Sequence, residues 1–238
     1  MKLKKSGKRI PLSLCLVFLG GIACDLGAGT VVGGEGASSG GKNACSIEDA
    51  DDGDDQTVVR DGRGGYIYTY VDSSGSSLSP PPNGFKAASG GAQNTSGALR
   101  FEGQLASSGE VYAGVGFSFT EPKSIHDISR YSGLSFMAKH GPDSTTNVRL
   151  KLPDINTDPD GKQCTEECYN DFGVDFSVTS EWTRYTINFA DLRQEEGWGQ
   201  PRPPGLDITK VYGIQWQVVS PGAKYDIWID EIEFLGCE

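Results

Sequence analysis

A series of short segments in which apolar and polar residues alternate is the feature that most constrains this chain. Such segments end at Gly, Pro, Asn or Asp, and only two short stretches, 124–131 and 189–194, have helical character. Many short strands separated by turn residues predict an all-β protein, a β-sandwich or jelly roll. The predicted strands are 66–71, 98–103, 113–119, 134–139, 148–153, 175–179, 184–189, 213–219 and 225–234.

The alternation also sorts the side chains of three predicted strands. In 134–139, 148–153 and 213–219, one face is apolar and directed toward a core, and the other carries thioether, cationic or amide groups. If these strands are neighbours, the second faces line one open surface. Gln and Arg suit sugar hydroxyls because each can make several hydrogen bonds. The candidate ligand-binding residues are Met137, Lys139, Arg149, Lys151, Gln215 and Gln217, with simple solvent exposure as the alternative for each.

Two aromatic residues outside the predicted strands are added to the candidate ligand-binding set. Trp198 lies in the Gly/Pro-rich stretch EEGWGQPRPP, and Tyr169 follows CTEEC. An exposed aromatic ring offers a flat surface on which a sugar can stack. Trp182, Trp216 and Trp228 lie in apolar segments and are expected in the core.

The N-terminus has the pattern of an export signal. MKLKKSGKR is basic and IPLSLCLVFLGGI is apolar, so residues 1–23 are expected to be a signal peptide. GIAC resembles a bacterial lipobox, which implies lipidation at Cys24; an ordinary signal peptide cut near Ala23 is the alternative. Residues 24–44 are Gly/Ser-rich and predict a tether, followed by one domain over 45–238. The expected location is the periplasm or cell surface, with the chain anchored to a membrane through Cys24.

The charge balance excludes one class of partner. The chain carries a formal net charge of −11, and residues 1–23 contain Lys and Arg but no acid, so removing them makes the remainder more negative. Such a surface repels nucleic acid, and no nucleic-acid partner is expected. Neutral sugars and metal cations are compatible with it.

Four cysteines remain after Cys15 in the leader and Cys24 are set aside. An even number in an exported protein predicts two disulfides, and four cysteines allow three pairings. The favoured pairs are Cys164–Cys168, a local clip, and Cys45–Cys237, which joins the two ends of the domain. A zinc site at CTEEC is the alternative, with only two histidines in the chain to add ligands.

The acidic run IEDADDGDD, residues 47–55, is a candidate calcium site. Closely spaced carboxylates around a glycine are hard oxygen ligands, although the EF-hand order is absent. Asp49 and Asp51 point the same way if the segment is extended, and Asp230 could complete the site. The alternative is a solvated acidic patch.

Motifs of common enzyme classes are missing from the sequence. It contains no G-x-S-x-G, no phosphate-binding glycine loop and no H-E-x-x-H. Glycoside hydrolysis needs two carboxylates flanking a bond, and no acidic pair stands in a distinctive setting. We therefore expect a protein that is not an enzyme.

The order of several motifs resembles a known group of domains. GRGGYIYTYVD follows the acidic turn, and YSGLSFMAKHG, VRLKLPD, NDFG, EWTRYTINFADLRQ, GIQWQV and IWIDEIEF come after it in turn. This order is similar to galactose-binding-like jelly rolls, which include family-eleven carbohydrate-binding modules and complex I intermediate-associated 30-kilodalton proteins. The resemblance implies a concave glycan-binding face and a structural calcium, with Asp49 and Asp51 at the opening and Asp230 on the last strand.

The leading hypothesis is a non-catalytic carbohydrate-binding domain of a cell-envelope lipoprotein, with a polysaccharide or other glycan on the concave sheet face. One alternative is an envelope interaction or assembly protein that uses the same fold. The other is a polysaccharide-degrading enzyme.

Overall fold

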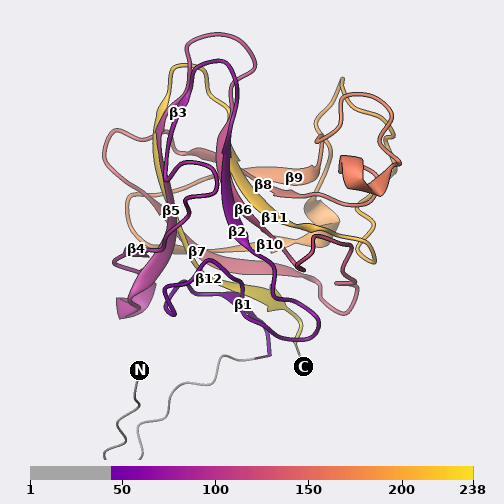
Figure 1. Ribbon diagram of the computed structural model, residues 1–238, viewed down its shortest axis with the longest axis horizontal. Coiled ribbons are helices and arrows are strands. Elements are labelled where there is room, and N and C mark those ends of the chain that lie inside the picture. The colour runs from indigo at the N-terminus through magenta and orange to yellow at the C-terminus, as the bar shows by residue number, and fades with distance from the viewer. Residues whose placement is uncertain (1–43, 238) are drawn as a thin grey trace, which may run out of the picture. The chain divides into compact units, whose positions relative to one another are not determined.

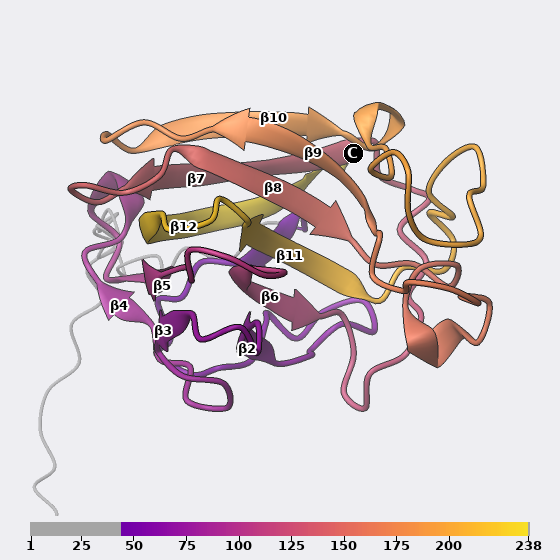
Figure 2. The same cartoon turned by 90° about the horizontal axis from the view of Figure 1, so that it is seen from above.

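Two antiparallel β-sheets packed face to face make up residues 44–237, the part of the chain that the computed structural model describes (Figure 1). The seven-stranded sheet has the order β10-β7-β12-β5-β3, with β1 pairing with β12 and β4 with β5. The five-stranded sheet has the order β2-β6-β11-β8-β9. Figure 2 shows the strands of each sheet side by side, with one sheet in front of the other. The all-β prediction is confirmed.

Each of the predicted strands coincides with a strand of the structure. The short strands β1, β3 and β4 were not predicted, because two or three residues are too few to show an alternation. The strands are β1 (Ser46–Glu48), β2 (Ile67–Val71), β3 (Ser77–Ser79), β4 (Ala88–Ser89), β5 (Gly97–Gln104), β6 (Ala113–Ser118), β7 (Gly133–His140), β8 (Asn147–Leu152), β9 (Phe172–Ser177), β10 (Thr183–Asn188), β11 (Gly213–Val218) and β12 (Lys224–Leu235).

The two segments with helical character do not form α-helices. In 124–131, His126 pairs with Val211 through an isolated antiparallel bridge. In 189–194, a single 3-10 turn, η3 (Phe189–Asp191), follows β10. Two further 3-10 turns are η1 (Ala92–Asn94) and η2 (Pro159–Gly161).

The core lies between the sheets and is formed by the apolar faces that the alternation predicts. Leu134, Phe136, Leu150, Ile214 and Trp216 are fully buried. Phe136 and Trp216 meet across the two layers edge to face, with ring centroids 5.4 Å apart. Burial of this apolar surface is the main stabilising contribution to the sandwich. The outer face of each sheet is therefore left for other roles.

Trp182 and Trp228 do not lie in the core, so that prediction is wrong. On β12, Ile227 and Ile229 point inward, and the alternation places Trp228 on the outer face of the seven-stranded sheet. The two indole rings stand edge to face, 6.5 Å apart. The Lys139 ammonium lies 4.7 Å from each ring, in the geometry of a cation–π contact.

The two ends of the domain are fastened together at β12. The first strand, β1, pairs with β12, and a disulfide joins Cys45 to Cys237. A second disulfide joins Cys164 to Cys168. Both predicted pairings are confirmed.

Three predictions fall wholly or almost wholly outside the described residues. They are the signal peptide over 1–23, the tether over 24–44 and lipidation at Cys24, and they stay predictions. Among residues 44–237, no helix is long and apolar enough to span a membrane.

Candidate functional site

The strand order separates the predicted binding residues into two groups. Strands β8 and β11 are neighbours, and Gln215 pairs with Lys151 while Gln217 pairs with Arg149. Strand β7 belongs to the other sheet. The expectation of one shared face is therefore wrong for its two residues, Met137 and Lys139. Alternation shows which side chains share a face of one strand, but it does not show which strands are neighbours.

The outer face of the five-stranded sheet, here called the groove face, carries a row of tyrosines. Tyr68 and Tyr70 on β2 lie opposite Gly116 and Gly114 on β6. A Cβ atom on Gly114 would be 2.5 Å from the Tyr70 ring, so the ring rests on the bare backbone of β6. The Tyr70 ring centroid lies 6.2 Å from that of Tyr68 and 6.2 Å from that of Tyr112. The glycines thus make room for a platform of aromatic rings.

The groove face continues from the tyrosines to amide side chains. The Gln215 side chain passes over Gly116, and its Nε2 donates a hydrogen bond of 3.0 Å to the Tyr68 hydroxyl. Burial raises the pKa of Tyr68 to about 12 and the pKa of Tyr70 well above its ordinary value. Both phenols are therefore neutral at physiological pH. Within residues 44–237, the buried Tyr70 hydroxyl has no hydrogen-bond partner.

Arg149 lies at the far side of the groove face and is held by three groups. Its Nη1 is 3.0 Å from Asp175 on β9, and its Nη2 donates a hydrogen bond of 2.7 Å to the carbonyl of Arg193. Its Nε lies 3.8 Å from Glu195. Arg149 is only 6% exposed, and its charge is paired with the carboxylates of Asp175 and Glu195, which lie at the surface. It shapes the groove face rather than presenting a free cation.

Lys151 is compensated in the same way. Its Nζ lies 3.1 Å from the fully buried Asp171 and donates a hydrogen bond of 3.0 Å to the carbonyl of Tyr169. Burial raises the pKa of Asp171, and Lys151 opposes that rise. Tyr169 also carries an exposed ring. The sequence predicted that the Tyr169 ring would stack on a sugar, but the group of Tyr169 that reaches the groove face is its backbone carbonyl.

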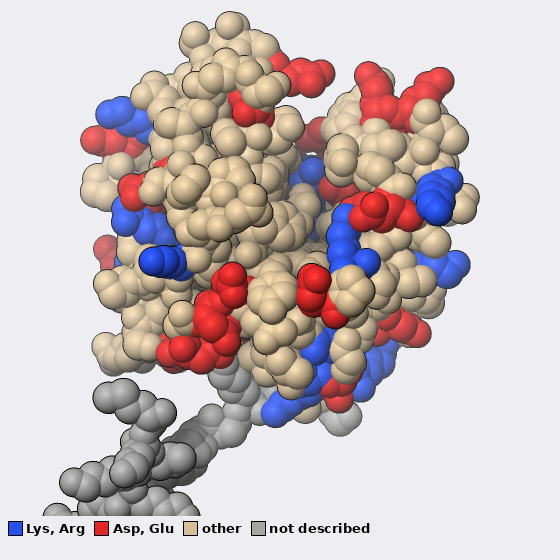
Figure 3. All heavy atoms as spheres, in the orientation of Figure 1, with Lys and Arg blue, Asp and Glu red and all other residues tan. Residues whose placement is uncertain are grey.

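A pocket of about 630 Å³ opens between β9 and the loop that follows η3. Arg149, Gly173 and Asp175 line its sheet side, and Glu195 and Trp198 line its loop side. The Trp198 Nε1 donates a hydrogen bond of 3.0 Å to Glu195. Figure 3 shows the surface hollowed beside the lobe of loops that is orange in Figure 1. Two residues predicted from distant parts of the sequence, Arg149 and Trp198, therefore line one pocket.

The acidic residues predicted to bind calcium are occupied by hydrogen bonds. The Asp51 Oδ1 accepts from the backbone amides of Ser96 and Gly97, at 2.7 and 2.9 Å. The Asp49 Oδ1 accepts from the Asp51 amide at 3.2 Å. In the described part of the chain, no group of three or more His, Cys, Asp or Glu residues is arranged to hold a metal ion.

The Asp230 carboxylate is held by hydrogen bonds to the segment around η1. Its Oδ2 accepts hydrogen bonds from the Ala92 amide at 2.7 Å and from the Thr95 hydroxyl at 3.0 Å. Burial raises the pKa of its neighbour Glu231, and the charge of Asp49 raises that pKa further. Among residues 44–237, Asp49, Asp51 and Asp230 do not form a group arranged to hold a metal ion.

The tyrosines were missed although their signal is in the sequence. In YIYTYV, residues 66–71, the alternation places Tyr66, Tyr68 and Tyr70 on one side. The sequence alone does not show whether these tyrosines face the core or the groove face. The pairing of β2 with β6 places them on the groove face.

A two-layer sandwich with an aromatic and amide groove face belongs to the class of β-sandwich carbohydrate-binding domains. Residues 57–235 match the model of the family carbohydrate binding domain 30, and the chain belongs to this family. It therefore carries a carbohydrate-binding domain, as predicted. A comparison with curated proteins gives no match.

Solved structures of related modules share the fold. A family 11 carbohydrate-binding module from Clostridium thermocellum, in complex with a β-1,3-1,4-mixed-linked tetrasaccharide, is 19% identical with a TM-score of 0.50; the match covers 71% of this chain and 88% of that one. The solution structure of CtCBM11 is 17% identical with a TM-score of 0.51, over 82% and 98%. A family 30 module is 14% identical with a TM-score of 0.50, over 70% and 90%. The predicted resemblance is confirmed.

Proposed function

We propose that this domain binds a neutral polysaccharide along the groove face and does not cleave it. The observation that carries the proposal is the row of Tyr68, Tyr70 and Tyr112 beside Gln215 and Gln217. Aromatic ring faces pack against the apolar face of a pyranose, and neutral hydroxyl and amide groups exchange hydrogen bonds with its hydroxyls. The cations of the groove face are already paired, which favours a neutral glycan over an acidic one.

The carboxylates around the groove face support binding without hydrolysis. Asp171 and Asp175 are paired with Lys151 and Arg149, and Glu195 accepts a hydrogen bond from Trp198. Hydrolysis of a glycosidic bond needs one carboxylic acid and one carboxylate that can both reach that bond. We therefore expect no release of reducing sugar from any polysaccharide that the protein retains.

The experiment is affinity electrophoresis through gels containing single polysaccharides, followed by calorimetry with oligosaccharides. The protein is the chain from residue 24 onward with Cys24→Ser, which prevents lipidation. Mixed-linked β-glucan is the first ligand to test, because the family 11 relative was solved with a tetrasaccharide of that linkage. Retention by none of a broad panel of plant, algal and bacterial polysaccharides would contradict the proposal and favour a protein partner.

Matched variants locate the binding face. Gln217→Ala and Tyr112→Ala should each weaken binding about tenfold, because a lost hydrogen bond or ring contact is worth about 1–1.5 kcal/mol. Lys139→Ala, on the outer face of the other sheet, is the control and should leave the affinity unchanged. If Lys139→Ala weakens binding and the other two variants do not, the glycan lies on the seven-stranded sheet.

We also propose that the domain works outside the cytoplasm, tethered through a lipid at Cys24. The two disulfides support an oxidising compartment. Metabolic labelling with a fatty acid should mark the wild-type chain and not a Cys24→Ser variant. Equal labelling of both would contradict lipidation at this residue.

A structural calcium is a separate proposal. Burial raises the pKa of Glu231, and the charges of Asp49 and Asp51 raise it further; a divalent cation would relieve that repulsion, which supports the proposal. Calcium should raise the Tm and a chelator should lower it. Equal Tm values in both conditions would contradict a bound calcium.

A further inference from the structure

We propose that the Cys164–Cys168 disulfide positions the wall of the groove that carries Trp198. Two loops form this wall: residues 164–170, here the disulfide loop, and residues 194–202, here the Trp198 loop. The inference rests on the proposed function, because the pocket between the Trp198 loop and β9 is taken as part of the glycan site. The disulfide loop itself contributes no residue to the lining of that pocket. Its role is to fix the loop that does.

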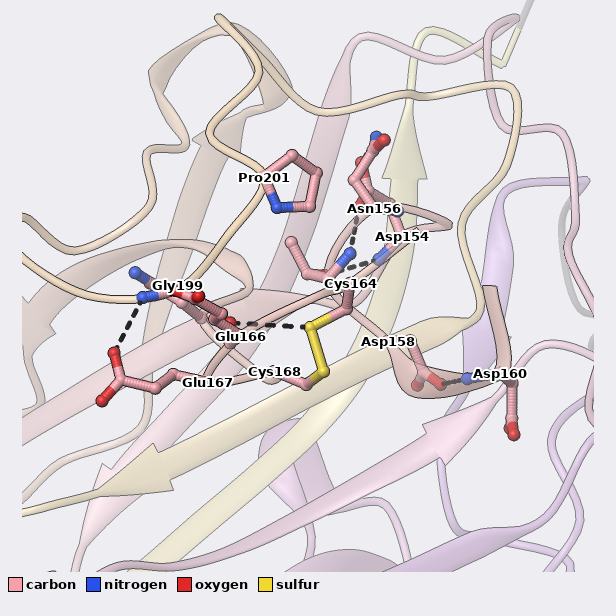
Figure 4. The surroundings of a disulfide bond; sticks show 12 residues. Asp154, Asn156, Asp158, Asp160, Cys164, Glu166, Glu167, Cys168, Gly199 and Pro201 are labelled. Atoms are coloured by element: carbon pink, nitrogen blue, oxygen red, sulfur yellow. Dashed lines mark hydrogen bonds between the residues drawn. A yellow bond between two sulfur atoms is a disulfide. The ribbon is translucent and has the colours of Figure 1, made fainter. Parts of the chain in front are cut away.

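The first link between the loops is a short antiparallel bridge. The Thr165 amide donates to the Gln200 carbonyl at 3.0 Å, and the Gln200 amide donates to the Glu166 carbonyl at 2.9 Å. The Gly199 amide donates to the Glu167 carboxylate at 3.3 Å, as Figure 4 shows. All three donor–acceptor pairs involve residues between Cys164 and Cys168, so the disulfide closes around the segment that holds the Trp198 loop.

The second link is the side chain of Asn170, two residues beyond Cys168. Its Nδ2 donates to the carbonyls of Glu195 and Trp198, at 2.9 and 2.7 Å. Its Oδ1 accepts from the Glu195 amide at 2.9 Å. Asn170 is 2% exposed, so these bonds are shielded from water. The backbone on both sides of the Trp198 indole is thereby tied to the end of the disulfide loop.

The disulfide loop needs a restraint to keep this shape. Glu167 and Tyr169 have φ values of 43° and 75°, in the left-handed region that residues other than glycine seldom adopt. Such conformations persist only where surrounding contacts impose them. Without the crosslink, the loop can return to ordinary φ values. The Thr165 amide and the Glu166 carbonyl then move away from Gln200. The Trp198 loop then loses its attachment to the disulfide loop at Gly199 and Gln200.

The test replaces the crosslink and measures both order and binding. In the double variant Cys164→Ser, Cys168→Ser, hydrogen exchange at the Gly199 and Gln200 amides should become about tenfold faster, because local opening becomes easier. Affinity for the polysaccharide that the wild type retains should fall about fivefold to tenfold, since the wall must be ordered on binding. Exchange in β11 and β12 should stay unchanged.

Two further variants separate this role from general damage. Asn170→Ala removes the second link and should accelerate exchange at Glu195 in a chain whose disulfide is intact. Cys45→Ser with Cys237→Ser is the control: well below its unfolding temperature it should leave exchange in the Trp198 loop unchanged. Unchanged exchange at Gly199 and Gln200 in the Cys164–Cys168 variant would overturn the inference. If the wild type binds no polysaccharide, the proposed function fails, and the exchange data still decide whether the disulfide positions the loop.

Discussion

At the scale of single residues, the bare backbone of β6 is what allows the Tyr70 ring to approach the groove face closely. A Cβ atom at Gly114 would lie 2.5 Å from the Tyr70 ring and 2.4 Å from the Trp216 carbonyl oxygen. Gly114→Ala should therefore lower stability by about 1–3 kcal/mol through overpacking and should also weaken glycan binding. Thermal unfolding and calorimetry measure the two effects.

The control for this prediction is Gly205→Ala. Nothing lies within 4 Å of a Cβ at that position, so both stability and affinity should stay near their wild-type values. A Gly114→Ala protein that binds as well as the wild type would show that the position of the Tyr70 ring does not matter for the ligand.

A second prediction at this scale concerns pH and Asp230. Burial raises the pKa of this carboxyl from 3.8 to about 6, against the hydrogen bonds that it accepts from Ala92, Thr95 and Glu231. The folded state therefore holds the proton more tightly than the unfolded chain. This contribution to stability is complete below about pH 4 and is lost as the pH rises through about 6.

Comparison of the wild type with Asp230→Asn isolates this contribution. The Asn amide does not titrate, and the pH-dependent contributions of most other groups are the same in both proteins and cancel in the difference. The free energy of unfolding of the wild type minus that of the variant should decrease from pH 4 to pH 7. Urea unfolding at each pH measures it. A difference that increases over this range would mean that the native hydrogen bonds outweigh burial and lower the pKa.

At the scale of elements, the sequence predicted strands and their faces, but not their neighbours. The alternation in 148–153 and 213–219 correctly placed Arg149, Lys151, Gln215 and Gln217 opposite the core. The alternation in 134–139 also separates a core face from an outer face, but this segment is β7, which lies in the other sheet. Strand pairing depends on contacts between segments far apart in the chain, and periodicity within one segment carries no information about them.

The last strand shows a second limit of periodicity. Ile229 and Ile232 are both in the core, three positions apart, because the register of β12 shifts between Asp230 and Glu233 and Glu231 adopts a φ of 48°. Such a bulge inserts an extra residue and reverses the alternation beyond it. A regular strand would place Ile229 and Glu231 on one face and Asp230 on the other, and of the acidic pair only Asp230 was predicted to be a metal ligand. In the structure the acidic pair marks the bulge.

At the scale of the whole molecule, the two disulfides should differ in what they contribute to stability. The Cys45–Cys237 bond spans 192 residues and the Cys164–Cys168 bond spans 4. A crosslink restricts the unfolded chain more when it closes a longer loop, which corresponds to roughly 5 kcal/mol for the first bond and roughly 2 kcal/mol for the second in the chain-entropy model. Replacing Cys45 and Cys237 with serines should therefore lower the free energy of urea unfolding more than replacing Cys164 and Cys168. Among molecules that remain folded, only the Cys164–Cys168 replacement should weaken glycan binding. A larger loss of stability from the Cys164–Cys168 replacement would show that the disulfide loop supports the whole sandwich and not only the wall of the groove.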